Sequence, residues 1–354
     1  MHTSGRNAGG YDALLGPNVS IVTGKGGVGK TTAAAALALA GVASGRRTLL
    51  VEVEGRQGFS RLFGTQPWDY QEREFRPGLW GSAIDPAEAV YEYLELFYGI
   101  KRIQWMMERS NALDFVTTTA PGLRDLLLVG KLYELEARRR PDGRRAYDLI
   151  VVDAPPTGRI VPFLLAPEAV TDIVRVGPIR RQAGRIKDML TDPRRVQAVI
   201  VTLLEEMPVR EATEGVLALA GAGIATGPVI ANQVALPRVT PAALERLDHL
   251  GAEVVRARAE ELGARMSGRT SELTLELAAS HVARQGLQAS LRAELEATGA
   301  RVLGLPLLTG ASFGVEDLEV LADTLALQVG EDGPRALARL DAAGLAAVIG
   351  EGQR

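Results

Sequence analysis

The chain has 354 residues, 46% of them hydrophobic and 23% charged, as expected of a soluble globular protein that can bury a large core. The chain contains 40 Lys and Arg and 43 Asp and Glu, which gives a formal charge of −3. The overall charge therefore does not favour binding to nucleic acid or to an anionic membrane. The absence of cysteine excludes disulfides, thiolate zinc sites and iron–sulfur clusters.

The N-terminus, residues 1–16, is rich in Gly, Ser and Asn and contains no long apolar run. This composition predicts a flexible segment rather than a signal peptide or an anchor. No window of the sequence reaches the roughly 18 consecutive apolar residues of a membrane-spanning helix. We therefore expect a cytoplasmic protein, and leave open whether it attaches to the periphery of a membrane.

Short apolar runs alternate with longer helical patterns between residues 17 and 329, which is the sequence form of βαβ units. The runs are dense in Val, Ile and Leu, as strands covered on both faces should be. The pattern predicts an α/β fold with a doubly wound, mostly parallel sheet. The predicted strands are Val19 to Thr23, Thr48 to Val53, Leu79 to Ile84, Tyr147 to Val152, Val196 to Thr202, Pro228 to Asn232 and Val302 to Leu305.

Two stretches are longer than a single crossover helix requires, and we interpret both as helical insertions in one core that spans residues 17–329. Residues 86–140 carry helical patterns at Ala87 to Tyr98, Lys101 to Glu108 and Leu123 to Arg140, and residues 241–298 are rich in Ala, Leu, Arg and Glu. Residues 330–354 follow a Gly/Pro break and predict a loosely attached C-terminal tail.

A glycine-rich segment, Gly-Lys-Gly-Gly-Val-Gly-Lys-Thr-Thr at 24–32, stands between the first predicted strand and a helical pattern. It satisfies G-x-x-x-x-G-K-[ST], and its strand and helix context disfavours a chance Gly-rich turn. Such a loop turns backbone N–H groups toward a β-phosphate, while Lys30 reaches the β and γ oxygens and Thr31 ligates Mg²⁺. The predicted phosphate-binding residues are Gly24, Gly26, Gly27, Val28, Gly29, Lys30, Thr31 and Thr32.

An aspartate, Asp153, follows the strand predicted at Tyr147 to Val152. The carboxyl ends of strands form the crevice in which α/β sheets bind ligands. Asp153 is therefore placed to hold Mg²⁺ through a water molecule and to sense the γ-phosphate. A helix N-cap is the alternative role for an aspartate in this position.

The amide of Asn232, at the end of another predicted strand, combines a donor with an acceptor, which suits N6 and N7 of adenine. Guanine-specific proteins use an [NT]-K-x-D element, and the sequence after Asn232 contains none. These two observations favour ATP over GTP.

The ordered series of motifs resembles the arsenite-pump and tail-anchored-protein-targeting ATPases from about Val19 to Leu327. The matching segments are Gly24 to Thr32, Ile84-Asp85-Pro86, Pro121-Gly122, Asp153 to Arg159, Val201 to Glu211, Asn232-Gln233 and Leu305-Pro306-Leu307. The resemblance implies a P-loop fold with Mg²⁺-dependent hydrolysis of ATP and a dimer. It also implies that the loop with Pro306 closes over the base, and that the lysine of the deviant Walker A motif, Lys25, crosses to the partner's nucleotide and assists hydrolysis there.

In the family that the chain resembles, the aspartate of the first switch, D-P-A-H-S, positions the attacking water. Here Glu54-Gly55-Arg56-Gln57-Gly58 stands in its place, so the resemblance implies that Glu54 is the catalytic carboxylate. Glu54 keeps a carboxylate on a side chain one methylene longer, so we expect hydrolysis that is slow or depends on a partner. The zinc-binding C-x-x-C and the metalloid-binding cysteines are missing, which excludes a zinc-stapled dimer and arsenite transport through thiols. The resemblance is therefore to a bacterial subgroup with an altered first switch.

Three function classes are consistent with the sequence. We favour a dimeric switch ATPase that couples its ATP state to a protein client or a membrane component, as a homodimer or with a related ATPase subunit. A weakly hydrolysing regulatory subunit of a heteromeric ATPase is the second class. A positioning or partition ATPase is the third, but the tail Pro334 to Gly350 carries only Arg335 and Arg339 against Asp341, and we expect no nucleic-acid partner.

Overall fold

The computed structural model describes residues 14–53, 57–85, 87–89, 92, 122–173, 176–308 and 313–329. These residues form an eight-stranded sheet with the order β3-β4-β2-β5-β1-β6-β7-β8. The strands are β1 Val19–Gly24, β2 Thr48–Val53, β3 Arg73–Arg76, β4 Leu79–Ile84, β5 Leu149–Asp153, β6 Val196–Leu203, β7 Val229–Val234 and β8 Val302–Pro306. The predicted α/β fold with a mostly parallel sheet is confirmed.

The edge strand β3 was not predicted from the sequence. It pairs antiparallel with β4, whereas the other neighbours in the described sheet are parallel. Its sequence, Arg-Glu-Phe-Arg, is charged and partly exposed. A short edge strand needs no continuous apolar run, so the pattern that revealed the central strands was absent here.

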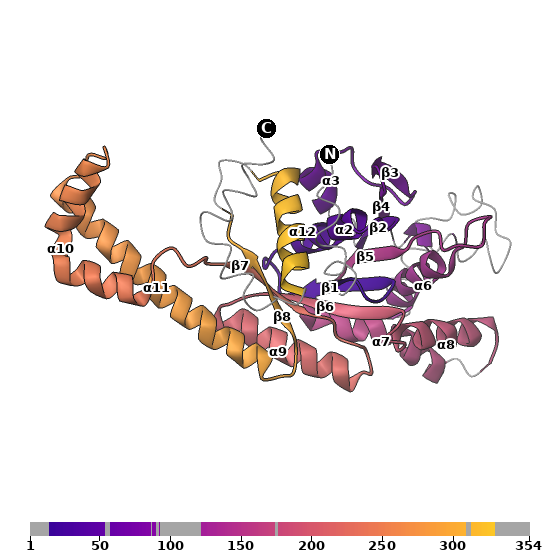
Figure 1. Cartoon of the computed structure of the whole chain (residues 1–354). Helices are drawn as coiled ribbons and strands as arrows, with labels where there is room; N and C mark the ends of the chain where they lie inside the picture. Colours follow the sequence, from indigo (N-terminus) through magenta and orange to yellow (C-terminus); the bar gives the residue numbers. More distant parts are fainter. Residues whose placement is uncertain are drawn as a thin grey trace.

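Helices cover both faces of the sheet (Figure 1). One face carries α2 Lys30–Ala43, α3 Gly58–Phe63 and α12 Val315–Val329. The other face carries α6 Leu123–Ala137, α7 Thr157–Ile173, α8 Pro178–Leu190 and α9 Glu206–Gly221. Side chains alternate along β2. Leu50 packs into the hydrophobic core on the side of α2, α3 and α12, whereas Leu49 and Val51 pack into the core on the side of α6 to α9. The sheet is thus doubly wound.

A helical hairpin extends from one end of the sheet (Figure 1). It consists of α10 Pro241–Glu261, which contains a kink at Gly251, and α11 Gly268–Glu296. The side chains of Thr240 and Ser267 cap the two helices, because they accept hydrogen bonds from the backbone N–H groups of Ala243 and Thr270. These two helices occupy most of the stretch 241–298.

The helix predicted at Leu123 to Arg140 ends three residues earlier, at Ala137. Arg138 is extended, and Arg139 forms a β-bridge with Arg145 around the turn at 141–143, so the backbone reverses direction instead of continuing the helix. Most of the patterns predicted at Ala87 to Tyr98 and at Lys101 to Glu108, most of the N-terminal segment and the tail at 330–354 lie outside the described residues.

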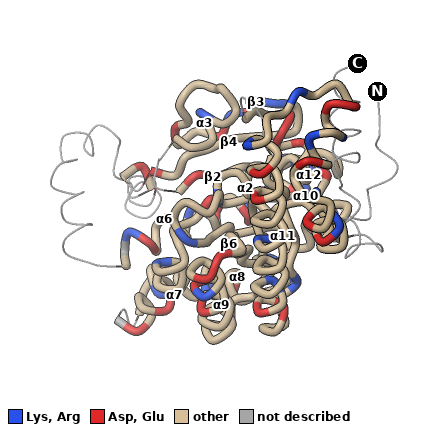
Figure 2. Tube along the Cα trace, turned by 90° about the vertical axis from the view of Figure 1, so that its left-hand side faces the viewer, with Lys and Arg blue, Asp and Glu red and all other residues tan. Residues whose placement is uncertain are grey.

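Basic and acidic side chains are interspersed on the described part of the chain, as the blue and red segments near α7, α9 and α11 illustrate (Figure 2). Arg138 pairs with Glu134, Arg145 pairs with Glu136, and Lys187 pairs with Glu168. The arginine cluster around residues 138–145 is therefore largely balanced within the chain. Among the described residues, no helix is both long enough and apolar enough to cross a membrane.

Candidate ATPase site

The loop between β1 and α2 has the backbone geometry of a phosphate cradle. Gly24, Gly27 and Gly29 adopt φ values of 153°, 88° and 89°, which side chains rarely allow. A Cβ on Gly24 would lie 2.1 Å from the carbonyl oxygen of Val201, and one on Gly29 would lie 2.2 Å from Nδ2 of Asn232. The glycines are therefore required by close contacts behind the loop as well as by its curvature.

The tip of the loop is open. A Cβ on Gly26 or Gly27 would meet no heavy atom of the structure within 4 Å. Lys30, the first residue of α2, is 8% exposed, and its Nζ donates to the carbonyl oxygen of Lys25 at 3.2 Å. The ammonium group thus bends back over the loop, so that amides and a cation surround a space suited to phosphate.

Lys25 forms an ion pair with Glu211 of α9, with 2.5 Å between Nζ and Oε1. The two side chains are 35% and 34% exposed, so the pair lies at the surface beside the loop. The sequence predicted that Lys25 acts on the nucleotide of a partner subunit, and that role stays a prediction. In the structure of the single chain, Lys25 pairs with Glu211 of α9 in the same chain.

Thr31 and Asp153 meet at the carboxyl ends of the strands. Oγ1 of Thr31 donates to Oδ2 of Asp153 at 2.7 Å. Both atoms are oxygens of the kind that Mg²⁺ prefers, and Mg²⁺ usually takes only one or two protein ligands and completes its shell with phosphate and water. The described residues contain no group of three or more His, Asp or Glu that could hold a metal alone. The pair therefore fits a metal that binds together with a nucleotide.

The segment that follows Asp153 is hydrogen-bonded to the strand that leads into the loop. Oγ1 of Thr23, on β1, donates to the carbonyl oxygen of Pro155 at 2.7 Å. Helix α7 begins at Thr157, and it packs against α6 and α8. A movement of the segment after Asp153 would thus be passed directly to the helices on that face of the sheet.

Asn232 supports the loop from below. Its Nδ2 donates to the carbonyl oxygen of Val28 at 2.9 Å, and its Oδ1 accepts from the backbone N–H of Gln233 at 2.9 Å. The side chain is 6% exposed. Recognition of adenine by Asn232 stays a prediction, as does closure over the base by Pro306, which ends β8 opposite Val234.

Sequence reasoning missed one carboxylate at this site, Glu52. It is 2% exposed near the end of β2, and its Oε1 accepts from the backbone N–H of Gly58 at 2.9 Å. The signal was present in the sequence, because Glu52 is the charged residue in the otherwise apolar or neutral strand Thr-Leu-Leu-Val-Glu-Val. Glu54, the predicted catalytic residue, lies outside the described residues, together with Gly55 and Arg56.

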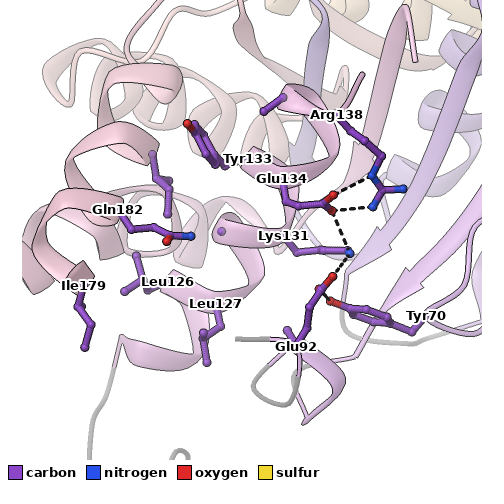
Figure 3. A pocket seen from close by; sticks show the side chains of 14 residues that line it. Tyr70, Glu92, Leu126, Leu127, Lys131, Tyr133, Glu134, Arg138, Ile179 and Gln182 are labelled. Carbon is purple, nitrogen blue, oxygen red and sulfur yellow. Dashed lines mark hydrogen bonds and ion pairs between the residues drawn. The ribbon is translucent and has the colours of Figure 1, made fainter. Parts of the chain in front are cut away.

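A separate cavity of about 440 Å³ lies between α6, α8 and the segments around Tyr70 and Glu92 (Figure 3). Its apolar wall is formed by Leu126, Leu127, Ile179 and Ile186. Its charged wall is internally paired: Nζ of Lys131 contacts Glu92 at 2.9 Å and Glu134 at 3.0 Å, and Glu134 also pairs with Arg138. Burial and a hydrogen bond to Glu92 raise the pKa of Tyr70, so its hydroxyl stays protonated.

Comparison with known proteins agrees with the geometry of the loop. A family model described as an anion-transporting ATPase matches residues 18–182, which include Lys25, Thr31 and Asp153. The ATPase BagA of Mycobacterium tuberculosis is 38% identical over 339 residues, or 92% of this chain and 97% of BagA. This chain belongs to the anion-transporting ATPase family. The putative ATPase Mb3704 of Mycobacterium bovis is equally similar, with 38% identity over 339 residues.

More distant members of the family are also similar to the chain. The arsenical pump-driving ATPase of Escherichia coli is 27% identical over 245 residues, which are 64% of this chain and 41% of that protein. The predicted resemblance is confirmed, and the chain is an ATPase of this family.

Proposed function

We propose that the chain is a dimeric switch ATPase that binds ATP with Mg²⁺ and couples its nucleotide state to the binding of a protein client or a membrane component. The observation that carries this proposal is the position of Lys25 at the rim of an open phosphate cradle, partly exposed and held by an ion pair with Glu211. A surface cation beside the cradle can leave that pair and reach a nucleotide in a facing subunit.

In this proposal, different residues bind the phosphates, hold Mg²⁺ and support the loop. The cradle of Gly24 to Gly29 donates backbone N–H groups to the phosphates, and Lys30 supplies the positive charge that the β and γ oxygens need. Thr31 and Asp153 would hold Mg²⁺, which neutralises charge on the phosphates when it is bound. Asn232 keeps the loop in shape through its hydrogen bond to Val28.

Coupling follows from the connection of Asp153 to α7. A change in the contacts of Asp153 displaces residues 154–156, which the hydrogen bond from Thr23 to Pro155 anchors on one side. The start of α7 at Thr157 lies directly after this segment, and α6 and α8 pack against α7. A client or membrane component would therefore sense the nucleotide on the face formed by α6 to α8. We place this activity in the cytoplasm, as a homodimer or with a related subunit.

A second candidate function is a weakly hydrolysing regulatory subunit. It is favoured by the contrast between an intact set of phosphate contacts and a first switch that carries Glu54 where the family has aspartate. The third class, a positioning or partition ATPase, receives less support because basic and acidic residues are interspersed along the described part of the chain (Figure 2).

The test combines turnover with oligomeric state. The purified chain is measured by light scattering after size-exclusion chromatography with ADP, with ATP and with a slowly hydrolysed ATP analogue, always with Mg²⁺. We expect a larger dimer fraction with the analogue than with ADP. A chain that stays monomeric in all three conditions, alone and with its native partners, would contradict the dimeric switch.

A further inference from the structure

The residue that the predicted mechanism leaves unused is the buried carboxylate Glu52. Strands β2 and β5 are parallel neighbours, and Glu52 is the register partner of Asp153. Two residues earlier, the partners Leu50 and Val151 both enter the core beneath α2. Since side chains alternate along a strand, Glu52 and Asp153 point to that same side, toward the start of α2.

Gly58 brings Glu52 close to Thr31. Its N–H donates to Oε1 of Glu52 at 2.9 Å. A Cβ built on Gly58 would lie 3.6 Å from Oε1 of Glu52, 3.0 Å from Cγ2 of Thr31 and 3.6 Å from Oγ1 of Thr31. Thr31 donates to Asp153 and lies beside Gly58, the residue that donates to Glu52, so carboxylates from two adjacent strands both lie near Thr31.

We propose that Glu52 is a second carboxylate of the ATP site, a positioning residue that makes the binding of ATP depend on Mg²⁺. Two negative charges beside Thr31 repel the phosphates of ATP that carries no metal. The same two charges attract the divalent cation, so the complex of Mg²⁺ with ATP is favoured over ATP alone. This inference rests on ATP binding at the cradle and does not require a dimer.

The alternative role for Glu52 is structural. Its carboxylate accepts a hydrogen bond from the backbone N–H of Gly58, the first residue of α3. The first N–H groups of a helix have no partner within the helix, so Glu52 would cap α3. Glutamine at this position keeps an acceptor oxygen and almost the same volume but removes the charge. Glu52→Gln therefore separates the electrostatic role from the capping role.

The experiment measures ATP affinity by calorimetry in excess EDTA and in excess Mg²⁺, for the full chain and for Glu52→Gln. We expect the variant to bind metal-free ATP about tenfold more tightly, because removing one charge relieves repulsion. The gain in affinity on adding Mg²⁺ should shrink by more than about tenfold, because the same change also weakens the attraction for the cation. Glu74→Gln is the matched control, since Glu74 also accepts a backbone N–H, from Gly78 at 2.9 Å, on the exposed edge strand.

A second variant, Glu52→Asp, keeps the negative charge but shortens the side chain that accepts from Gly58. Glu52→Asp should retain the Mg²⁺ dependence of the unmodified chain even if its shorter side chain loses the N–H of Gly58. The inference is overturned if Glu52→Gln changes affinity equally with and without Mg²⁺, or if Glu52→Asp loses the dependence. An unmodified chain that binds no ATP in either buffer would instead overturn the ATP assignment itself.

Discussion

Nζ of Lys25 lies 2.5 Å from Oε1 of Glu211, which joins the tip of the phosphate loop to α9 across 186 positions of sequence. The two side chains are about one-third exposed, so water screens the pair, and it contributes at most about 1 kcal/mol to stability. The contact is therefore weak enough to break when a nucleotide or a second subunit offers Lys25 another anion.

Substituting either member of this pair should change turnover rather than folding. Lys25→Ala should leave ATP affinity within about threefold and lower both turnover and ATP-dependent dimerisation, because a cation that acts on transferring charge stabilises the transition state more than the bound substrate. Glu211→Gln should raise turnover and the dimer fraction with ATP, because it releases Lys25 from its ion pair.

Steady-state turnover and sedimentation measure the two effects. Lys187→Ala is the matched control, because Lys187 also forms an exposed ion pair, with Glu168 at 2.9 Å, away from the loop. Equal turnover in Lys25→Ala and the unmodified chain would show that the lysine is a bystander.

A methyl group at Gly29 should damage the cradle. Gly29 has a φ of 89°, and its Cβ would lie 2.2 Å from Nδ2 of Asn232, which holds the loop through Val28. We expect Gly29→Ala to lower the free energy of unfolding by about 2 kcal/mol and to weaken ATP binding at least tenfold. Gly184→Ala in α8, where a Cβ meets no described heavy atom within 4 Å, should change neither quantity adversely. Denaturant titration and calorimetry test both variants.

The buried carboxylate Glu136 should make stability depend on acid pH. Burial would by itself raise the pKa of Glu136, but hydrogen bonds from Arg195 and Arg145 outweigh it and hold the pKa below its usual value. The stabilisation is therefore complete above the unfolded-state pKa of about 4.3 and is lost as pH falls through the lower folded-state value.

Glu136→Gln should cost about 3 kcal/mol at neutral pH, because it leaves two arginines without their charged partner. Melting temperatures between pH 7 and pH 3 should then fall less steeply on acidification than those of the unmodified chain. Glu214→Gln, which removes an exposed pair with Arg210, should leave the slope unchanged, and an equal slope in all three proteins would contradict the role of Glu136.

Turnover of Glu54 variants decides between a self-sufficient enzyme and a subunit that needs a related partner. We expect the purified chain to turn over more slowly than about 1 per second, and Glu54→Asp to be faster, since it restores the shorter carboxylate of the family pattern. The heteromeric interpretation fails if the purified chain already reaches about 1 per second and Glu54→Gln eliminates that activity.

The contacts that the sequence revealed are local. The motif at 24–32 lies between a strand and a helix, so Lys30 and Thr31 could be placed from spacing alone. The contacts of Lys25 and Glu52 were not predictable in this way, because Glu211 comes from a distant helix and the register of β2 against β5 is set by packing of the whole sheet. Strand β3 was missed for a related reason, since pairing with β4 rather than its own sequence makes it a strand.

The hairpin of α10 and α11 has a mechanical consequence. All of α10 is described, and none of its residues is buried, whereas Leu291 and Leu295 near the end of α11 are buried at the sheet. The backbone N–H of Ala235, just after β7, donates to Oε1 of Gln288 at 3.0 Å, so the root of the hairpin is fastened to the strand that carries Asn232. A helix of 29 residues is roughly 44 Å long. Tilting such a helix by about 5° at its buried end moves its exposed end by roughly 4 Å. A small movement beside the phosphate loop would therefore displace the far end of the hairpin by about the width of a side chain.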